Sequence, residues 1–190
     1  MNEILLLVSD FDGTLVDTFK ANFLAYQKVL FVKGIKLTLS DYSKMFGLRF
    51  NEFMQELGIK DDEEIEDIRR YKAICYPDYF QEIKLNKPLL DFLSASKDSG
   101  KFIALATTAQ RANVLNILEY FNIVDKFAYL LTGEDVKYAK PHPECYLKTM
   151  EYFSVSSGNT LIFEDSEVGI AAAKRSGAHY MVINKEFYEY

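Results

Sequence analysis

The stretch ILLLVSDFDGTLVDT, residues 4–18, carries the most information about the fold. It begins with an uninterrupted apolar run, ILLLV, which is typical of a strand covered on both faces. Two carboxylates, Asp10 and Asp12, follow one residue apart, and Gly13 opens a turn behind them. Neighbouring like charges raise each other's cost of ionisation, so the pair is not expected at the end of a strand that serves only as a connection. A hard cation bound between them would relieve the repulsion.

Four more apolar runs predict further strands. They are FIALA at 102–106, LIF at 161–163, YMVI at 180–183 and a weaker one, AYLL, at 128–131. Helical patterns separate them: one begins at Pro88 and ends at Gly100, another begins at Pro143, and Ser166 and Gly177 bound a third. The second has Tyr146, Leu147, Met150 and Phe153 on one apolar stripe. Buried strands that alternate with helices predict an α/β fold, a Rossmann-like parallel sheet core with helices on both faces.

Residues 17–87 break this alternation. They contain no convincing strand, and three segments there have helical patterns: DTFKANFLAYQKVLFVKG, NEFMQELG and DDEEIEDIRRYKAIC. We therefore expect an all-helical cap at 17–87, inserted into an α/β catalytic core formed by 1–16 and 88–190. Asp17 is expected to be the hinge and the N-cap where the chain enters the cap.

Composition narrows the classes of partner. The 190 residues are 49% hydrophobic and 26% charged, as in globular proteins, and the net charge is −6. This charge disfavours binding to nucleic acid or to an anionic membrane. Cys75 and Cys145 fit neither a metal motif nor a disulfide framework, which predicts two buried thiols. Without a signal peptide or a run of about 20 apolar residues, we expect a cytoplasmic protein. We also expect a monomer or a weak homo-oligomer.

Polar side chains follow four of the predicted strands. The carboxyl ends of parallel strands meet at one edge of a sheet, where ligands bind. Each group alone has an ordinary explanation, such as a strand threonine, a solvated loop lysine or a charged lead-in to a helix. Their convergence at one edge favours a functional site. The groups are Asp10 with Asp12, Thr107 with Thr108, Lys140, and Glu164 with Asp165.

The same residues resemble the four motifs of the haloacid dehalogenase superfamily, in the family's order and over essentially the whole chain. The insertion resembles the helical cap of the β-phosphoglucomutase-like and phosphoglycolate-phosphatase-like members. Little chain follows YMVI, so the last peripheral elements of many relatives are missing or minimal. The matching segments are Asp10-Phe-Asp-Gly-Thr, Thr107, Lys140-Pro-His-Pro, and Glu164-Asp-Ser beside GIAAAKRSG.

The resemblance implies a role for each of these residues. Asp10 would be the nucleophile that forms an aspartyl-phosphate, and Asp12 the general acid and base. Thr107 and Lys140 would hold the phosphoryl oxygens. The remaining candidates are Gly13, Thr108 and Arg49 for substrate binding, and Asp10, Asp12, Glu164 and Asp165 for Mg²⁺, with Glu164 acting directly or through water.

These roles predict a Mg²⁺-dependent phosphatase for a small phosphorylated metabolite, with a sugar phosphate as one candidate. A β-phosphoglucomutase-like phosphomutase is the close alternative, since it uses the same nucleophile. A hydrolytic dehalogenase is disfavoured because the dehalogenases of the family lack the second acid, Asp12. A receiver-like phosphoacceptor or a silent binding module is a remote alternative, because a receiver fold has no use for a long helical insertion.

Overall fold

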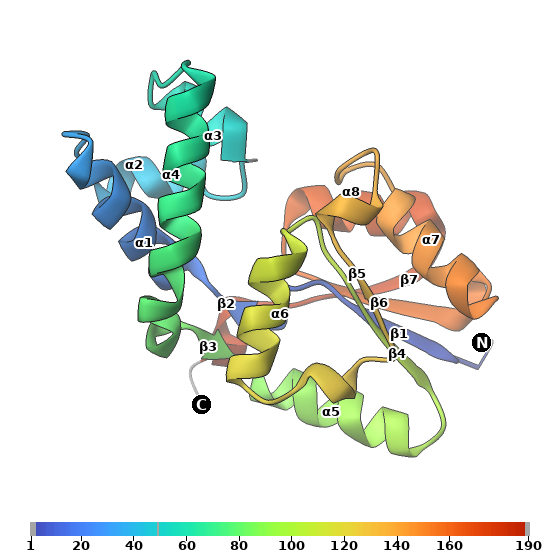
Figure 1. Cartoon of the computed structure of the whole chain (residues 1–190). Coiled ribbons are helices and arrows are strands. Elements are labelled where there is room, and N and C mark those ends of the chain that lie inside the picture. Colours follow the sequence, from blue (N-terminus) through green and yellow to red (C-terminus); the bar gives the residue numbers. More distant parts are fainter. Residues whose placement is uncertain (1–2, 49, 189–190) are drawn as a thin grey trace. The chain divides into compact units, whose positions relative to one another are not determined.

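The core of the protein is a five-stranded parallel sheet (Figure 1). The computed structural model describes residues 3–48 and 50–188, except the side chains of 185 and 187. All four strand pairings are parallel, which confirms the predicted α/β fold. The strands, in their order across the sheet, are β5 (Tyr129–Leu131), β4 (Phe102–Ala106), β1 (Leu6–Ser9), β6 (Thr160–Glu164) and β7 (His179–Val182).

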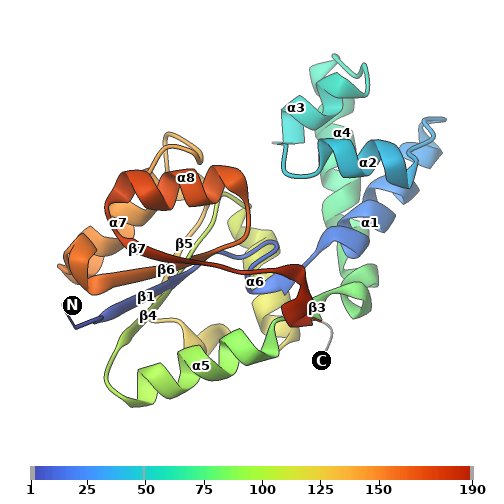
Figure 2. The ribbon, with the colours of Figure 1, turned by 180° about the vertical axis from the view of Figure 1, so that it is seen from behind.

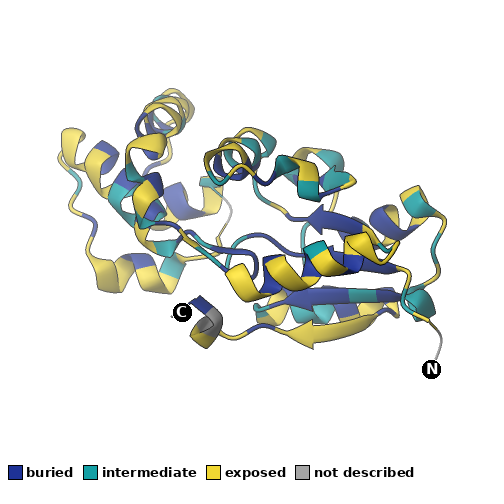
Figure 3. Ribbon diagram, turned by 90° about the horizontal axis from the view of Figure 1, so that it is seen from below, coloured by how far each residue is buried: buried dark blue, intermediate teal, exposed yellow. Residues whose placement is uncertain are grey.

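Helices cover both faces of this sheet. α5 (Lys87–Asp98) and α6 (Arg111–Tyr120) lie on one face, and α7 (Glu144–Phe153) and α8 (Glu167–Ser176) on the other (Figures 1 and 2). Every residue of β1 is buried, and the central strands are dark blue in Figure 3. This double cover explains why the strand sequences are apolar runs rather than alternating patterns.

The helix ends agree with the sequence in most places. Ser166 caps α8 by accepting a hydrogen bond from the Gly169 N–H, and Gly177 ends this helix in a left-handed conformation. α5 was expected to begin at Pro88 and begins one residue earlier, at Lys87; Asn86 caps it by accepting from the Leu89 N–H. Leu147 was expected on the apolar stripe of α7 but is 45% exposed.

Residues Thr18–Ile83 form a second compact unit, separate from the unit of Met1–Asp17 and Lys84–Tyr190. Tyr42 is its buried centre, in contact with the rings of Phe19, Phe23, Tyr26, Phe46 and Phe53. The sequence had not predicted α2. The unit's elements are α1 (Phe19–Val32), α2 (Leu39–Met45), α3 (Phe50–Glu56), α4 (Asp62–Cys75) and the 3-10 helix η1 (Tyr76–Glu82).

A short antiparallel ribbon joins the two chain segments of the core unit. It pairs β2 (Val16–Asp17) with β3 (Lys84–Leu85). Two expectations are corrected here. The segment 17–87 was predicted to be free of strand, yet β3 lies within it. Asp17 was predicted to cap α1, but Thr18 occupies the N-cap position and its side chain makes no cap hydrogen bond.

The remaining elements are short 3-10 helices: η2 (Val124–Lys126), η3 (Gly133–Asp135), η4 (Ser157–Asn159) and η5 (Lys185–Tyr188). Cys75 and Cys145 are both buried and form no disulfide, as expected. Within the described ranges, none of the helices has the length and apolarity needed to cross a membrane.

Candidate active site

The strand register brings Asp10 to the carboxyl edge of the sheet. Ser9, the last residue of β1, is level with Leu105 of β4 and Phe163 of β6. The Asp10 N–H then donates to the Phe163 carbonyl at 3.0 Å. One further step along all three strands sets Asp10 between Ala106 and Glu164, so two acids far apart in the sequence meet at one edge.

Lys140 lies between these two acids. Its Nζ donates to Asp10 Oδ1, to Glu164 Oε1 at 2.6 Å and to the Ala106 carbonyl at 3.4 Å. The lysine side chain is 6% exposed and that of Glu164 is fully buried. A buried cation shared by two buried carboxylates compensates charges that would otherwise be costly to remove from water.

Asp165 joins this group from the end of β6. Its Oδ1 accepts a hydrogen bond from Thr14 Oγ1 at 2.9 Å, which ties it to the turn after β1. Gly13 in that turn has a φ of +91°, and a Cβ on it would overlap the Asp165 carboxylate. Glycine is therefore required here both for its backbone conformation and for the space beside Asp165.

The charges of the group are strongly coupled. Burial raises the pKa of Asp10 well above its usual value; Lys140 opposes this rise, and Glu164 and Asp165 add to it. Burial likewise raises the pKa of Asp165 to about 6, against the hydrogen bond from Thr14. The pKa of Glu164 is lowered, because Lys140 and several hydrogen bonds outweigh its burial. Burial alone would lower the pKa of Lys140, but Asp10 and its other neighbours raise it well above its usual value.

Three of the predicted metal ligands fit a hard cation. Asp10, Glu164 and Asp165 each offer a carboxylate oxygen, and these oxygens lie within 4.8 Å of one another. An all-oxygen donor set with an excess of negative charge is what Mg²⁺ requires. The predicted donor set is therefore chemically suited to this ion.

The other predicted residues lie nearby with different exposure. Asp12 is half-buried in the turn after β1, where it bridges to Val16. Thr107 is buried at the end of β4, and its Oγ1 accepts from the Ala109 N–H. Thr108 is exposed. Arg49, the predicted substrate-binding residue of the cap, lies outside the described residues.

The structure adds residues that sequence reasoning missed. The hydroxyl of Tyr146 donates to Glu164 Oε1 at 2.7 Å, and both residues are fully buried. The side chain of Asn86 donates to the Thr14 carbonyl and so fixes the turn after β1 against α5. In the sequence, Tyr146 was identifiable only as a member of the apolar stripe of α7. Such a stripe does not show where the hydroxyl of a tyrosine points.

Tyr188 is a further buried residue near the acids. The carboxylates of Asp165, Asp17, Asp10 and Asp12 and, above all, burial raise the pKa of its hydroxyl. This hydroxyl has no hydrogen-bond partner among the described residues. The 3-10 helix η5 thus contributes a buried side chain.

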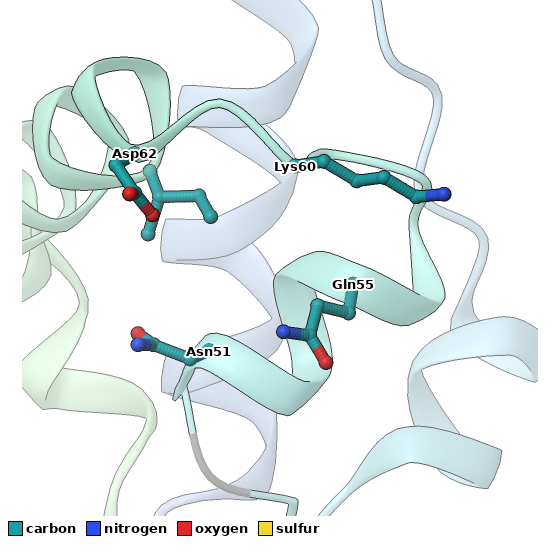
Figure 4. A pocket seen from close by; sticks show the side chains of 5 residues that line it. Asn51, Gln55, Lys60 and Asp62 are labelled. Atoms are coloured by element: carbon teal, nitrogen blue, oxygen red, sulfur yellow. The ribbon is translucent and has the colours of Figure 1, made fainter.

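A separate hollow lies wholly within the helical unit (Figure 4). It has a volume of about 330 Å³ and lies between α3 and the start of α4. Its lining side chains offer amides, one lysine and one acid, without the clustered carboxylates of the sheet edge. The lining residues are Asn51, Gln55, Lys60, Asp62 and Ile65.

Fold and site together define an α/β enzyme whose acids and lysine meet at the carboxyl edge of a parallel sheet. A family model described as haloacid dehalogenase-like hydrolase matches residues 7–183. The chain therefore belongs to the haloacid dehalogenase-like hydrolases, which confirms the resemblance found in its motifs and sets aside the receiver-like alternative.

Individual relatives agree with this assignment. YhcW of Bacillus subtilis is 32% identical over 93% of this chain and 82% of its own length. The phosphorylated carbohydrates phosphatase of Thermotoga maritima is 30% identical over 90% of this chain and 81% of its own. The crystal structure of CbbY from Rhodobacter sphaeroides superposes with a TM-score of 0.86 at 23% identity, covering 98% of this chain and 89% of CbbY.

The first prediction concerns Gly13. We expect Gly13→Ala to lower kcat/KM for a generic aryl phosphate at least ~10²-fold, because its Cβ displaces the Asp165 carboxylate. Gly100→Ala is the matched control, since Gly100 has a φ of +86° but open space around its Cβ position. Both variants carry backbone strain of about 1–2 kcal/mol, measurable by urea unfolding. Equal loss of activity in the two variants would contradict the assignment.

The second prediction concerns Asp165 in protein kept metal-free with a chelator. Folding raises the pKa of this acid to about 6, from about 3.9 in an unfolded chain. The folded state therefore holds this proton more tightly, and its contribution to stability is lost as pH rises from about 4 to about 6. We expect the Tm of wild type relative to Asp165→Asn to fall across this window and to level off above it. A Tm difference that does not change with pH would contradict this.

Proposed function

We propose that this protein is a Mg²⁺-dependent phosphatase that hydrolyses a small phosphorylated metabolite, a sugar phosphate, through an aspartyl-phosphate on Asp10. Its enzyme class is that of the haloacid dehalogenase-like phosphoric monoester hydrolases, and the Thermotoga maritima relative is a phosphatase of phosphorylated carbohydrates. The observation that carries the proposal is the buried Asp10 carboxylate, paired with Lys140 and clustered with Glu164 and Asp165.

Asp10 is suited to act as the nucleophile. Its backbone is fixed by the hydrogen bond to Phe163 at the end of β1, and Lys140 holds one of its oxygens. An Asp10 oxygen attacks phosphorus, the bond from phosphorus to the leaving oxygen breaks, and an acyl phosphate forms. Phosphoryl transfer depends on in-line positioning and charge neutralisation, and a fixed carboxylate beside a buried ammonium group supplies both.

Asp12 is suited to move the protons. It follows Asp10 by two residues on the turn that Gly13 and Val16 close, and it is half-buried, which leaves it accessible to a leaving group. Asp12 gives its proton to the leaving alkoxide. It then takes a proton from the water that attacks the acyl phosphate, which releases phosphate and restores Asp10.

Asp10, Asp165 and the backbone carbonyl of Asp12 would hold Mg²⁺, with Glu164 acting directly or through water. When bound, the ion neutralises the charge that develops on the phosphoryl oxygens. Lys140 keeps its charge over the working pH range, because Asp10 and its other neighbours raise its pKa. Thr107 is buried just after β4, next to the end of β1, and its hydroxyl would donate to a phosphoryl oxygen.

Substrate choice is assigned to the helical insertion, residues 17–87, acting as a cap. A cap excludes water and contacts the leaving group. Arg49 is its proposed recognition residue, because a guanidinium fork suits a second phosphate or a carboxylate. A sugar phosphate is favoured because a phosphatase for phosphorylated carbohydrates is 30% identical over most of the chain.

The third prediction tests the nucleophile. We expect Asp10→Asn to lower kcat for p-nitrophenyl phosphate with Mg²⁺ by on the order of 10³-fold or more, because an amide does not attack phosphorus. Chelation of the ion should abolish wild-type activity. Asp91→Asn, which removes an exposed acid of α5, should behave as wild type. Undiminished hydrolysis by Asp10→Asn would refute the nucleophile assignment.

A phosphomutase would use the same nucleophile but return the phosphoryl group to its substrate. The fourth prediction separates the two reactions with a panel of sugar phosphates and other phosphometabolites. We expect release of inorganic phosphate to exceed isomerisation on every substrate that turns over. Arg49→Ala should flatten the discrimination within the panel while p-nitrophenyl phosphate hydrolysis is retained. Net isomerisation would assign a mutase, and unchanged discrimination would remove Arg49 from substrate recognition.

A further inference from the structure

The carboxylate of Glu164 is surrounded by hydrogen-bond donors. Lys140 Nζ and the Tyr146 hydroxyl donate to Oε1 at 2.6 and 2.7 Å. The N–H groups of Asp165 and Ser166 and the Ser166 hydroxyl donate to Oε2 at 3.0–3.2 Å. A carboxylate has roughly four lone-pair sites, so these five donors occupy its whole capacity.

Tyr146 is held rigidly against this group. It lies in the first turn of α7, immediately after the segment Lys140–Pro143, and is fully buried. The centre of its ring is 4.9 Å from Lys140 Nζ, so the ring packs against the ammonium group. The hydroxyl of the same side chain binds Glu164, which is the partner of that ammonium group. One side chain therefore touches both members of the Lys140–Glu164 pair.

The Tyr146 hydroxyl restricts the ways in which Glu164 can use Oε1. With the hydroxyl in place, Oε1 is held in one orientation, toward Lys140. Gly169 of α8 closes the other side, because a Cβ there would overlap the Glu164 carboxylate. Without the hydroxyl, Oε1 would keep Lys140 as its sole hydrogen-bond donor among the described residues. The position of Oε1 would then depend on Lys140 alone, while three donors still hold Oε2.

We propose that Tyr146 is a positioning residue whose hydroxyl fixes the Glu164 carboxylate, so that Glu164 holds the Lys140 ammonium group against Asp10. This inference rests on the proposed function, since the position of Lys140 matters to phosphoryl transfer. Glu164 then contributes charge and orientation to the site, and a direct bond from Glu164 to a metal ion would require one of its five donors to leave.

Tyr146→Phe tests the hydroxyl alone, because it keeps the ring and removes one oxygen. We expect kcat for p-nitrophenyl phosphate to fall about tenfold while KM stays within about twofold, as for other residues that orient a group in contact with substrate. Tyr152→Phe in the same helix is the matched control, since Tyr152 is 59% exposed, and it should leave both constants unchanged. A kcat for Tyr146→Phe within twofold of wild type would overturn the proposal.

A double-mutant cycle distinguishes positioning from general destabilisation. If the hydroxyl acts through Glu164, Tyr146→Phe should have little further effect on kcat in a Glu164→Gln background. Additive losses in the two variants, with the Tm of Tyr146→Phe lowered to match, would show a structural role only and would refute the proposal.

A third measurement does not depend on activity. In protein labelled with ¹⁵N-lysine, a buried Lys140 should give a slowly exchanging ammonium signal that contacts the Tyr146 ring, and Tyr146→Phe should shift that signal. If wild type lacks phosphatase activity but shows this signal, the proposed function fails and the pairing stands. If the wild-type signal exchanges as fast as that of surface lysines, the positioning role fails whatever the activity, even where Tyr146→Phe does not fold.

Discussion

The site depends on one buried ammonium group. Lys140 is shared by Asp10 and Glu164, two carboxylates that a parallel sheet brings to the same edge. Removal of the lysine would leave two unpaired acids out of contact with water, which is far more costly than the loss of a surface ion pair. The loop that carries Lys140 is therefore needed for the stability of the sheet edge.

The backbone around this group leaves little freedom to the acids. Gly13 and Gly169 lie where any Cβ would overlap the carboxylates of Asp165 and Glu164, respectively. Thr14 holds Asp165, and Asn86 holds Thr14 from the start of α5. A set of carboxylates confined in this way is preorganised, because the neighbouring backbone leaves little room for other arrangements.

Much of the core could be predicted from the sequence, because each strand and most helix ends are defined by residues that are adjacent in the sequence. Five apolar runs gave the five strands, and Ser166 and Gly177 marked the ends of α8. The motifs were predicted to converge because all parallel strands end at one edge.

Other features depend on tertiary contacts that a sequence pattern does not express. Tyr146 was visible as a member of an apolar stripe, while its bond to Glu164 depends on the packing of α7 against β4 and β1. The cap of α1 was assigned to Asp17 because the strand pairing of Asp17 with Lys84 had no local signal.

That pairing has a consequence for how such a chain can vary. β2 and β3 place the exit and the return of the helical insertion side by side, and both strands belong to the core unit. The cost of closing a loop grows only slowly with its length when its ends are already adjacent. The ribbon thus fixes the two ends of the insertion. Insertions of different length or shape could be exchanged there without disturbing the register that sets Asp10 beside Glu164. If the insertion selects the substrate, as proposed above, its exchange could bring new substrates while the acids at the sheet edge stayed the same.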